Sequence, residues 1–345
     1  MNKHFDFLIV GLGSIGSTHL KYVMNTTNKF AIVDPNLESH KLVEDPMLEA
    51  SRECYLSIDD IPSGYSFDIA IISNWGPDHY QSILQLKLKG IKKFIVEKPL
   101  VSKLDDLNKL RKMVKNQEIQ IVVNMPLSIS QLSSKLVELS GNEYLGDIHN
   151  VVVTGGAKCL VTNGIHYVGL ASKIFQTTPT QVIASINTNP INPRSAKFLF
   201  AQGTATWHFS DEKWLSVSFS NNSHLQVCIE IVYTFGRVLI DGDLARVYVI
   251  ENEKRSKIDK PARTFYAKEN ILNFNPFYDE RGLDGMGNLY DKLHESLIWE
   301  DFEHGAGAAE SIIGMLIASK IRKHIKLPLT QEMVAEHQET EWNIS

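Results

Sequence analysis

Short apolar runs alternate with amphipathic stretches in the first third of the chain. The runs are rich in Ile and Val and predict strands covered on both faces, as in a parallel sheet. They span residues 5–10, 30–34, 68–73, 93–97 and 119–124. Between them lie predicted helices; one has Leu104, Leu107 and Leu110 at helical spacing. Strands that alternate with helices predict a doubly wound α/β domain.

The pattern changes after a predicted helix near residues 128–140. Further runs predict strands with few helices between them, at 148–154, 181–187, 204–209, 214–220, 225–233, 236–240 and 245–251. Leu215, Val217 and Phe219 alternate with serines, which is typical of an antiparallel strand with one buried face. A long helix is predicted at 305–325. We therefore expect residues 1–124 to form the doubly wound domain, and residues 125–345 to form an α+β domain with a large, mainly antiparallel open sheet.

Composition narrows the class of protein. A length of 345 residues suits about two domains. The 35 Lys and Arg against 40 Asp and Glu give a net charge of −5, which argues against a nucleic-acid partner. No apolar run approaches the ~20 residues that span a bilayer, and the N-terminus has no signal-peptide pattern. The 3 cysteines are far apart, so we expect reduced thiols, no metal site and a cytoplasmic protein.

A glycine-rich motif, GLGSIG at residues 11–16, follows the first predicted strand and opens a helix. The first glycine permits the tight turn, the second admits a pyrophosphate close to the backbone, and the third lets helix and strand pack closely. The N-terminus of the helix then offers N–H groups to the phosphates. We expect dinucleotide contacts from Gly11, Gly13, Ser14, Ile15 and Gly16.

Asp34 ends the next predicted strand, near the spacing expected of the acid that binds the adenosine ribose. A carboxylate there accepts hydrogen bonds from the ribose hydroxyls and repels a 2′-phosphate. Residues 35–37 supply no Lys or Arg to offset that repulsion. The sequence therefore favours NAD over NADP.

Polar residues also follow two later strands of the predicted sheet. Ligands of open α/β sheets bind beyond the carboxyl ends of the strands. We therefore expect the cofactor to lie near Ser73, Asn74, Trp75, His79, Glu97, Lys98 and Pro99. Lys98 could donate a hydrogen bond to a substrate hydroxyl or carbonyl and stabilise developing negative charge.

Five segments in this order resemble the glucose–fructose oxidoreductase / inositol dehydrogenase (Gfo/Idh/MocA) family. They are the motif at 11–16, His19 soon after it, EKP at 97–99, GG at 155–156 leading into NGIHY at 163–167, and IVYTFGR at 231–237. The resemblance runs from about residue 5 to residue 329. It implies an N-terminal Rossmann domain and a C-terminal domain whose open sheet is often used for oligomerisation.

The resemblance also implies a nicotinamide-dependent oxidoreductase acting on sugars, cyclitols or nucleotide-linked sugars. By that resemblance, Lys98 matches the lysine that polarises the reacting oxygen, and His166 matches the catalytic acid/base. We expect both to converge beside the nicotinamide. His166 would lie in the first turn of a helix capped by Asn163, where the helix dipole favours a neutral ring.

Two positions depart from the family pattern. Thr162 stands where the family commonly has Asp, four residues before the histidine, and NMP at 124–126 replaces Asn-x-Arg. Asn163 could supply a hydrogen bond to a substrate hydroxyl instead. These changes suggest an atypical substrate or lost activity. The expected substrate contacts are Lys98, Asn124, Thr162, Asn163 and His166.

The leading hypothesis is an NAD-dependent oxidoreductase that moves a hydride between nicotinamide and a hydroxyl or keto carbon of a sugar-like molecule, in surface polysaccharide metabolism. The alternatives are a lyase or hydrolase that retains its NAD, and a catalytically silent dinucleotide-binding regulatory protein. We expect a homodimer or homotetramer, because a second subunit's sheet could cover the other face of the large sheet, especially if Trp207 and Phe209 point outward.

Overall fold

The computed structural model describes residues 2–37, 52–188, 200–210, 212–241, 244–255, 264–270, 285–293 and 295–337, with residues 340 and 342. The chain forms two compact units. The first comprises residues 1–125, 289–310 and 331–345, and the second comprises residues 126–288 and 311–330. None of the described helices is both long enough and apolar enough to cross a membrane.

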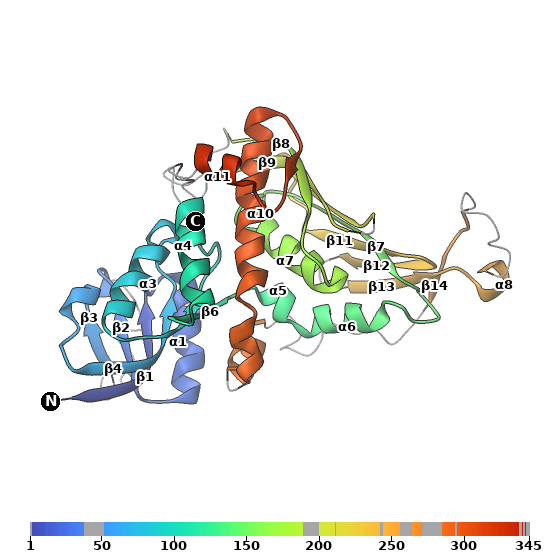
Figure 1. Ribbon diagram of the computed structural model, residues 1–345. Coiled ribbons are helices and arrows are strands. Elements are labelled where there is room, and N and C mark those ends of the chain that lie inside the picture. The colour runs from blue at the N-terminus through green and yellow to red at the C-terminus, as the bar shows by residue number, and fades with distance from the viewer. Residues whose placement is uncertain are drawn as a thin grey trace. The chain divides into compact units, whose positions relative to one another are not determined.

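The first unit contains a six-stranded parallel sheet in the order β3-β2-β1-β4-β5-β6 (Figure 1). Its strands are β1 (Lys3–Val10), β2 (Phe30–Val33), β3 (Arg52–Tyr55), β4 (Tyr65–Ile72), β5 (Lys93–Val96) and β6 (Gln120–Val123). The α-helices that the structure describes between these strands are α1 (Ser14–Thr26), α3 (His79–Leu88) and α4 (Leu104–Lys115). This is the predicted doubly wound fold. The strand order reverses between β1 and β4, and ligands of such sheets bind at that point.

Burial explains which strands could be predicted. All four residues of β2 are buried, and so is every residue of β5 and β6 except the first. Such strands read as continuous apolar runs. Strand β3 pairs only with β2, and its sequence, Arg-Glu-Cys-Tyr, has no such run. This edge strand is missing from the sequence prediction because it carries no apolar signal.

The second unit contains a nine-stranded sheet in the order β14-β13-β12-β11-β7-β10-β9-β8-β15. Its strands are β7 (Ile148–Gly155), β8 (Gln181–Asn187), β9 (Gln202–His208), β10 (Trp214–Phe219), β11 (Cys228–Tyr233), β12 (Gly236–Asp241), β13 (Leu244–Val249), β14 (Lys268–Asn270) and β15 (Ile325–Lys326). Only β7 and β10 pair in parallel; the other described pairs are antiparallel. The predicted α+β domain with a mainly antiparallel sheet is thus confirmed.

One face of this sheet is covered by helices of the same unit. Helix α7 (Gly164–Phe175) packs against β7 and β10, and α5 (Pro126–Ile129) and α6 (Gln131–Leu139) pack against α7 (Figure 1). Trp207 and Phe209 do not point outward from this sheet. Trp207 has no exposed surface, and its indole N–H donates to the carbonyl of Ser311; Phe209 packs edge-on against Phe175. Both rings belong to the core because helices already cover the face of the sheet on which they lie.

The chain returns to the first unit after residue 288, whereas the sequence reading assigned everything after residue 124 to the second domain. The described helical segments after that point are α9 (Gly285–Asp291), η5 (Ser296–Glu300), α10 (Phe302–Ile321) and α11 (Gln331–His337). Residues 302–310 of α10 belong to the first unit and residues 311–321 to the second. A Cβ added at Gly305 would lie 2.3 Å from Cβ of Val123 at the end of β6, so this glycine allows close packing. The division of the chain into these two units therefore depends on packing between segments that are far apart in sequence.

The remaining short helices are η3 (Ile58–Asp60), η4 (Gly76–Asp78) and α8 (Asn252–Arg255).

Candidate functional site

The glycine-rich turn joins β1 to α1 at the point where the strand order reverses. Gly11 has φ +91°, which favours glycine, and a Cβ there would lie 2.5 Å from the backbone of Asn74. A Cβ at Gly16 would lie 2.0 Å from the carbonyl oxygen of Gly11. Gly13 differs, because a Cβ there would meet nothing within 4 Å. The first and third glycines are thus required by the fold, and the second is not.

Two buried side chains hold this turn. The Asp34 carboxylate accepts hydrogen bonds from the backbone N–H groups of Leu12 (2.6 Å) and Asn36 (2.7 Å). The Ser73 hydroxyl, after β4, donates to the carbonyl oxygens of Val10 and Gly11 at 3.1 and 2.8 Å. Both residues lie beside the predicted dinucleotide site, and both also maintain the shape of the turn.

Few of the predicted cofactor-binding residues beside the glycine-rich turn are exposed to solvent. Gly13, Ser14, Ile15 and Trp75 are exposed, and Lys98 is half-buried. No side chain caps α1 at Gly13, and its first turn holds no acidic residue, so its N-terminal N–H groups can meet an anion. These features fit the pyrophosphate of a dinucleotide.

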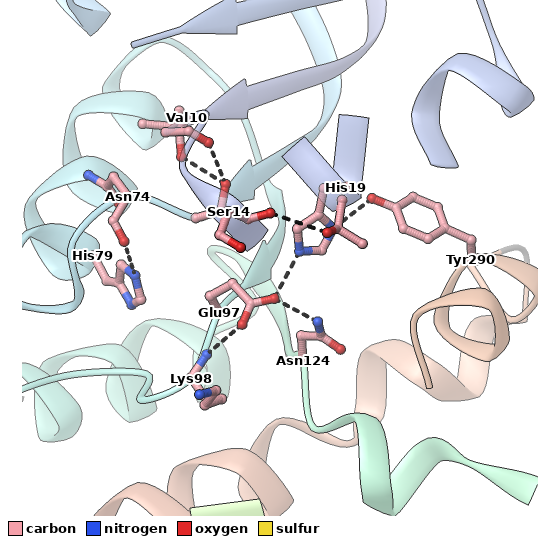
Figure 2. A network of polar contacts seen from close by, with 12 residues as sticks. Val10, Ser14, His19, Asn74, His79, Glu97, Lys98, Asn124 and Tyr290 are labelled. Atoms are coloured by element: carbon pink, nitrogen blue, oxygen red, sulfur yellow. Dashed lines mark hydrogen bonds and ion pairs between the residues drawn. The ribbon is translucent and has the colours of Figure 1, made fainter. Parts of the chain in front are cut away.

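Asn74 and His79 connect the loop after β4 to the turn after β5. The Asn74 amide donates to the Ser82 hydroxyl at 2.9 Å. The His79 ring is buried; its Nε2 lies 3.2 Å from the carbonyl of Asn74 (Figure 2), and its Nδ1 lies 3.1 Å from that of Pro99. Burial lowers the pKa of His79, so the ring is neutral and donates to one carbonyl at a time. His79 thus links the two loops from within the domain.

A second polar network surrounds Glu97, directly after β5 (Figure 2). Its Oε1 accepts from Nε2 of His19 at 2.9 Å and from the Asn124 amide at 2.6 Å, and its Oε2 accepts from the backbone N–H of Lys98 at 3.3 Å. On the other side of the His19 ring, Nδ1 lies 2.8 Å from the hydroxyl of Tyr290. Residues from four separate segments thus meet around one carboxylate.

The charge of this network is set by opposing effects on Glu97. Burial raises the pKa of Glu97, but the hydrogen bond and charge of His19, the Asn124 amide and the charge of Lys98 outweigh it, so the pKa is lowered. Burial and the charge of Glu97 raise the pKa of Tyr290. Glu97 is therefore an ionised acceptor, and Tyr290 is a neutral phenol.

The network changes the interpretation of two residues. Asn124 was expected to touch the substrate, but it has no exposed surface and its amide binds Glu97. In this arrangement Asn124 supports Glu97. Tyr290 is absent from the sequence prediction, because nothing in its local sequence marks it, and only the return of the chain places it beside His19.

The remaining predicted residues lie in the second unit. His166 occupies the first turn of α7, as predicted, and is half-buried; Thr162 is 9% exposed. Asn163 stands at the N-cap position but makes no capping hydrogen bond; its Oδ1 instead accepts from the backbone N–H of Cys159 at 3.1 Å. The short loop before the helix, rather than the helix itself, uses this side chain. Lys98 belongs to the first unit and His166 to the second, so their convergence stays a prediction.

Comparison with known proteins agrees with this geometry. Residues 5–125 match the model of the family GFO_IDH_MocA, described as an oxidoreductase family with an NAD-binding Rossmann fold. This match, over residues 5–125, confirms the resemblance drawn from the sequence.

Solved structures share the fold over nearly the whole chain. One is a super-repressor mutant of Gal80p from Saccharomyces cerevisiae (13% identity, TM-score 0.69, covering 94% of this chain and 98% of that one). Another is the WlbA dehydrogenase from Bordetella pertussis in complex with NADH and UDP-GlcNAcA (18%, 0.66, 96% and 99%). A third is myo-inositol 2-dehydrogenase from Lactobacillus plantarum (17%, 0.65, 94% and 99%). The same fold thus occurs in dehydrogenases and in Gal80p.

Proposed function

We propose that this protein is an NAD-dependent oxidoreductase that acts on a hydroxyl or keto carbon of a sugar, a cyclitol or a nucleotide-linked sugar. Bound NAD would supply the hydride chemistry. Lys98 would donate a hydrogen bond to the reacting oxygen and stabilise negative charge on it. His166 would take the hydroxyl proton in oxidation and return it in reduction.

One observation carries the cofactor part of this proposal. Gly13, Ser14 and Ile15 are exposed at the start of an uncapped helix, at the strand-order reversal of a domain in the NAD-binding family. Gly11 and Gly16 are explained by packing, but no contact with the residues that the structure describes requires glycine at position 13. A ligand backbone that approaches closely there explains it.

The difference between Gly13 and the other two glycines of the motif suggests a substitution that tests cofactor binding. In Gly13→Val the new side chain meets no atom of the chain at its Cβ, so the melting temperature should stay within a few degrees of wild type. It should nevertheless weaken NADH binding by at least about tenfold, because it projects where the pyrophosphate must lie. Thr26→Val, at the other end of the same helix, is the matched control and should bind NADH normally. Unchanged NADH affinity in Gly13→Val contradicts the proposal.

Turnover is tested with the wild-type protein and a panel of sugars, cyclitols and nucleotide-linked sugars. Formation of NADH or NAD with one class of substrate supports the oxidoreductase. Product formed with no net change in the cofactor identifies instead a lyase or hydrolase that retains its NAD.

A second candidate is a dinucleotide-binding regulatory protein without turnover. Thr162 favours it, because this hydroxyl cannot replace an ionised carboxylate beside the histidine. Gal80p, described as a transcriptional regulator, has the same fold. NADH binding without turnover across the whole panel supports this candidate over the enzyme.

We also propose that the protein assembles as a homodimer or homotetramer. The argument no longer involves Trp207 and Phe209, which are buried within the second unit. It rests on the large sheet of that unit, which the family often uses for assembly. A monomeric mass by light scattering at micromolar concentration would refute it.

A further inference from the structure

His19 is a buried titratable side chain to which the proposed function gives no task. It lies on α1 with no exposed surface, between Glu97 and Tyr290. Burying a carboxylate and an imidazole costs free energy, and apolar side chains of similar volume would fill the space at lower cost. We therefore ask what the Glu97–His19 pair does at this position, where Glu97 directly precedes Lys98.

The hydrogen bonds form a continuous chain from Tyr290 to Glu97. The ionised Glu97 carboxylate only accepts, so Nε2–H of His19 donates to it. On the other side of the ring, Nδ1 of His19 and the Tyr290 hydroxyl share a hydrogen bond of 2.8 Å. Tyr290 is itself fixed by a parallel stack on Tyr22, with ring centroids 5.2 Å apart. Figure 2 shows this chain running from Tyr290 through His19 to Glu97, with Lys98 next to the carboxylate.

Among the described residues, the titratable groups around Glu97 come from several elements. His19 approaches from α1, Tyr290 from α9 and Lys98 from the same turn, and the charge of Glu97 also acts on His79 of α3. His19 makes the largest favourable contribution to the ionised form of Glu97. Removing His19 therefore removes the main reason why this buried carboxylate stays charged.

We propose that His19 and Tyr290 are positioning residues for Lys98, acting through Glu97, whose carboxylate they hold in place directly before the lysine. The proposal rests on the proposed function, in which Lys98 binds the reacting oxygen. The Glu97 carboxylate accepts a hydrogen bond from the Lys98 backbone N–H at 3.3 Å, so a fixed carboxylate helps to fix the backbone at Lys98. The hydrogen-bonded side chains of Tyr290, His19 and Glu97 thus hold the proposed catalytic lysine in position.

The test observes Lys98 without any turnover. Lysines are reductively methylated with ¹³C-formaldehyde, the Lys98 signal is assigned by its loss in Lys98→Arg, and its shift is followed from pH 3 to 8. In His19→Leu we expect a carboxyl inflection about one unit or more higher than in wild type, because burial is no longer offset. His19→Gln keeps an N–H donor toward Glu97, so its inflection should lie between those of wild type and His19→Leu. Tyr290→Phe should move the inflection in the same direction by less.

Assignment of that inflection uses a second substitution. The double variant His19→Leu with Glu97→Gln has neither imidazole nor carboxyl, so the inflection should vanish. If Lys98 reports the same inflection in wild type, His19→Leu and Tyr290→Phe, the proposal is wrong. If His19→Leu does not fold, Tyr290→Phe and the ¹⁵N NMR signal of Nε2 in wild-type His19 still decide; an Nε2 that carries no proton contradicts the hydrogen bond to Glu97.

The two proposals can fail separately. If an active substrate is found, His19→Leu should lower kcat more than it raises KM, and His19→Gln should restore kcat. If NADH binds and no substrate turns over, the proposed function fails, while the NMR titration still shows whether His19 controls the charge beside Lys98.

Discussion

The two regions with candidate chemistry are constructed in opposite ways. In the first unit, Glu97 is bonded by side chains from α1 and the end of β6, and the α1 side chain, His19, is bonded in turn to Tyr290 of α9. In the second unit, Thr162, Asn163 and His166 come from one short stretch, and Asn163 is bonded to Cys159 only four residues away. One region depends on contacts distant in sequence, and the other on local geometry.

Because of this difference, substitutions in the two regions should affect folding stability and chemistry to different extents. A substitution around Glu97 leaves buried partners on several elements without their hydrogen bonds, so it should affect folding as well as the site. A substitution at His166 removes a half-buried side chain from the start of one helix, so it should affect chemistry with little effect on folding. Four predictions test this comparison.

The largest effect is expected for His166→Ala. If His166 transfers the proton, turnover should fall by about 10²–10⁴-fold. NADH affinity and melting temperature should stay close to wild type, because His166 belongs to the other unit. Kinetics with the active substrate and an NADH titration measure both. His149→Ala, an exposed histidine on β7, is the control and should keep full activity; undiminished turnover in His166→Ala refutes the assigned role.

Glu97→Gln should destabilise the first unit by about 2 kcal/mol, because a buried, ionised acceptor of several hydrogen bonds is lost. The lowered pKa of Glu97 means that its ionisation stabilises the fold above the ordinary value of 4.5, and that this contribution is lost as pH falls through the lowered pKa. The difference from wild type in urea unfolding should therefore be full at pH 7 and shrink below about pH 4. An equal difference at both pH values would contradict the ionised state.

Asp34→Ala should reduce the preference for NAD over NADP by about tenfold, since the carboxylate that repels a 2′-phosphate is gone. The same change removes the acceptor of the Leu12 and Asn36 N–H groups, so the affinity for both dinucleotides should also fall. Titration with NADH and NADPH gives the ratio. A wild-type preference for NADPH would show that Asp34 does not select the cofactor.

The smallest effect is expected for Tyr290→Phe, at about 1 kcal/mol of unfolding free energy. The substitution removes the hydroxyl that binds His19 and keeps the stack on Tyr22. Tyr80→Phe, on α3 of the same unit, is the control. Chemical denaturation of both variants measures the difference, and equal stability of the two would mean that the His19 contact adds nothing.

Much of the first domain follows from its sequence. Buried parallel strands must be apolar along their whole length, so β2, β5 and β6 are visible as runs of Ile and Val. The glycine motif is visible because only glycine fits at Gly11 and Gly16, where the backbone is crowded. Asp34 and Lys98 follow from their places at the ends of predicted strands.

Tertiary structure alone decided the rest. The sequence left open whether Trp207 points outward from its strand. The ring is buried, and its indole N–H donates to a backbone carbonyl of α10 within the same unit. Asn124 was expected to contact the substrate, but its side-chain amide donates a hydrogen bond to Glu97. Tyr290 carries no local signal, and it reaches His19 because the chain returns to the first unit after residue 288. Local patterns show which residues must be buried or must turn, whereas the partner of a buried polar group is set by where distant segments meet.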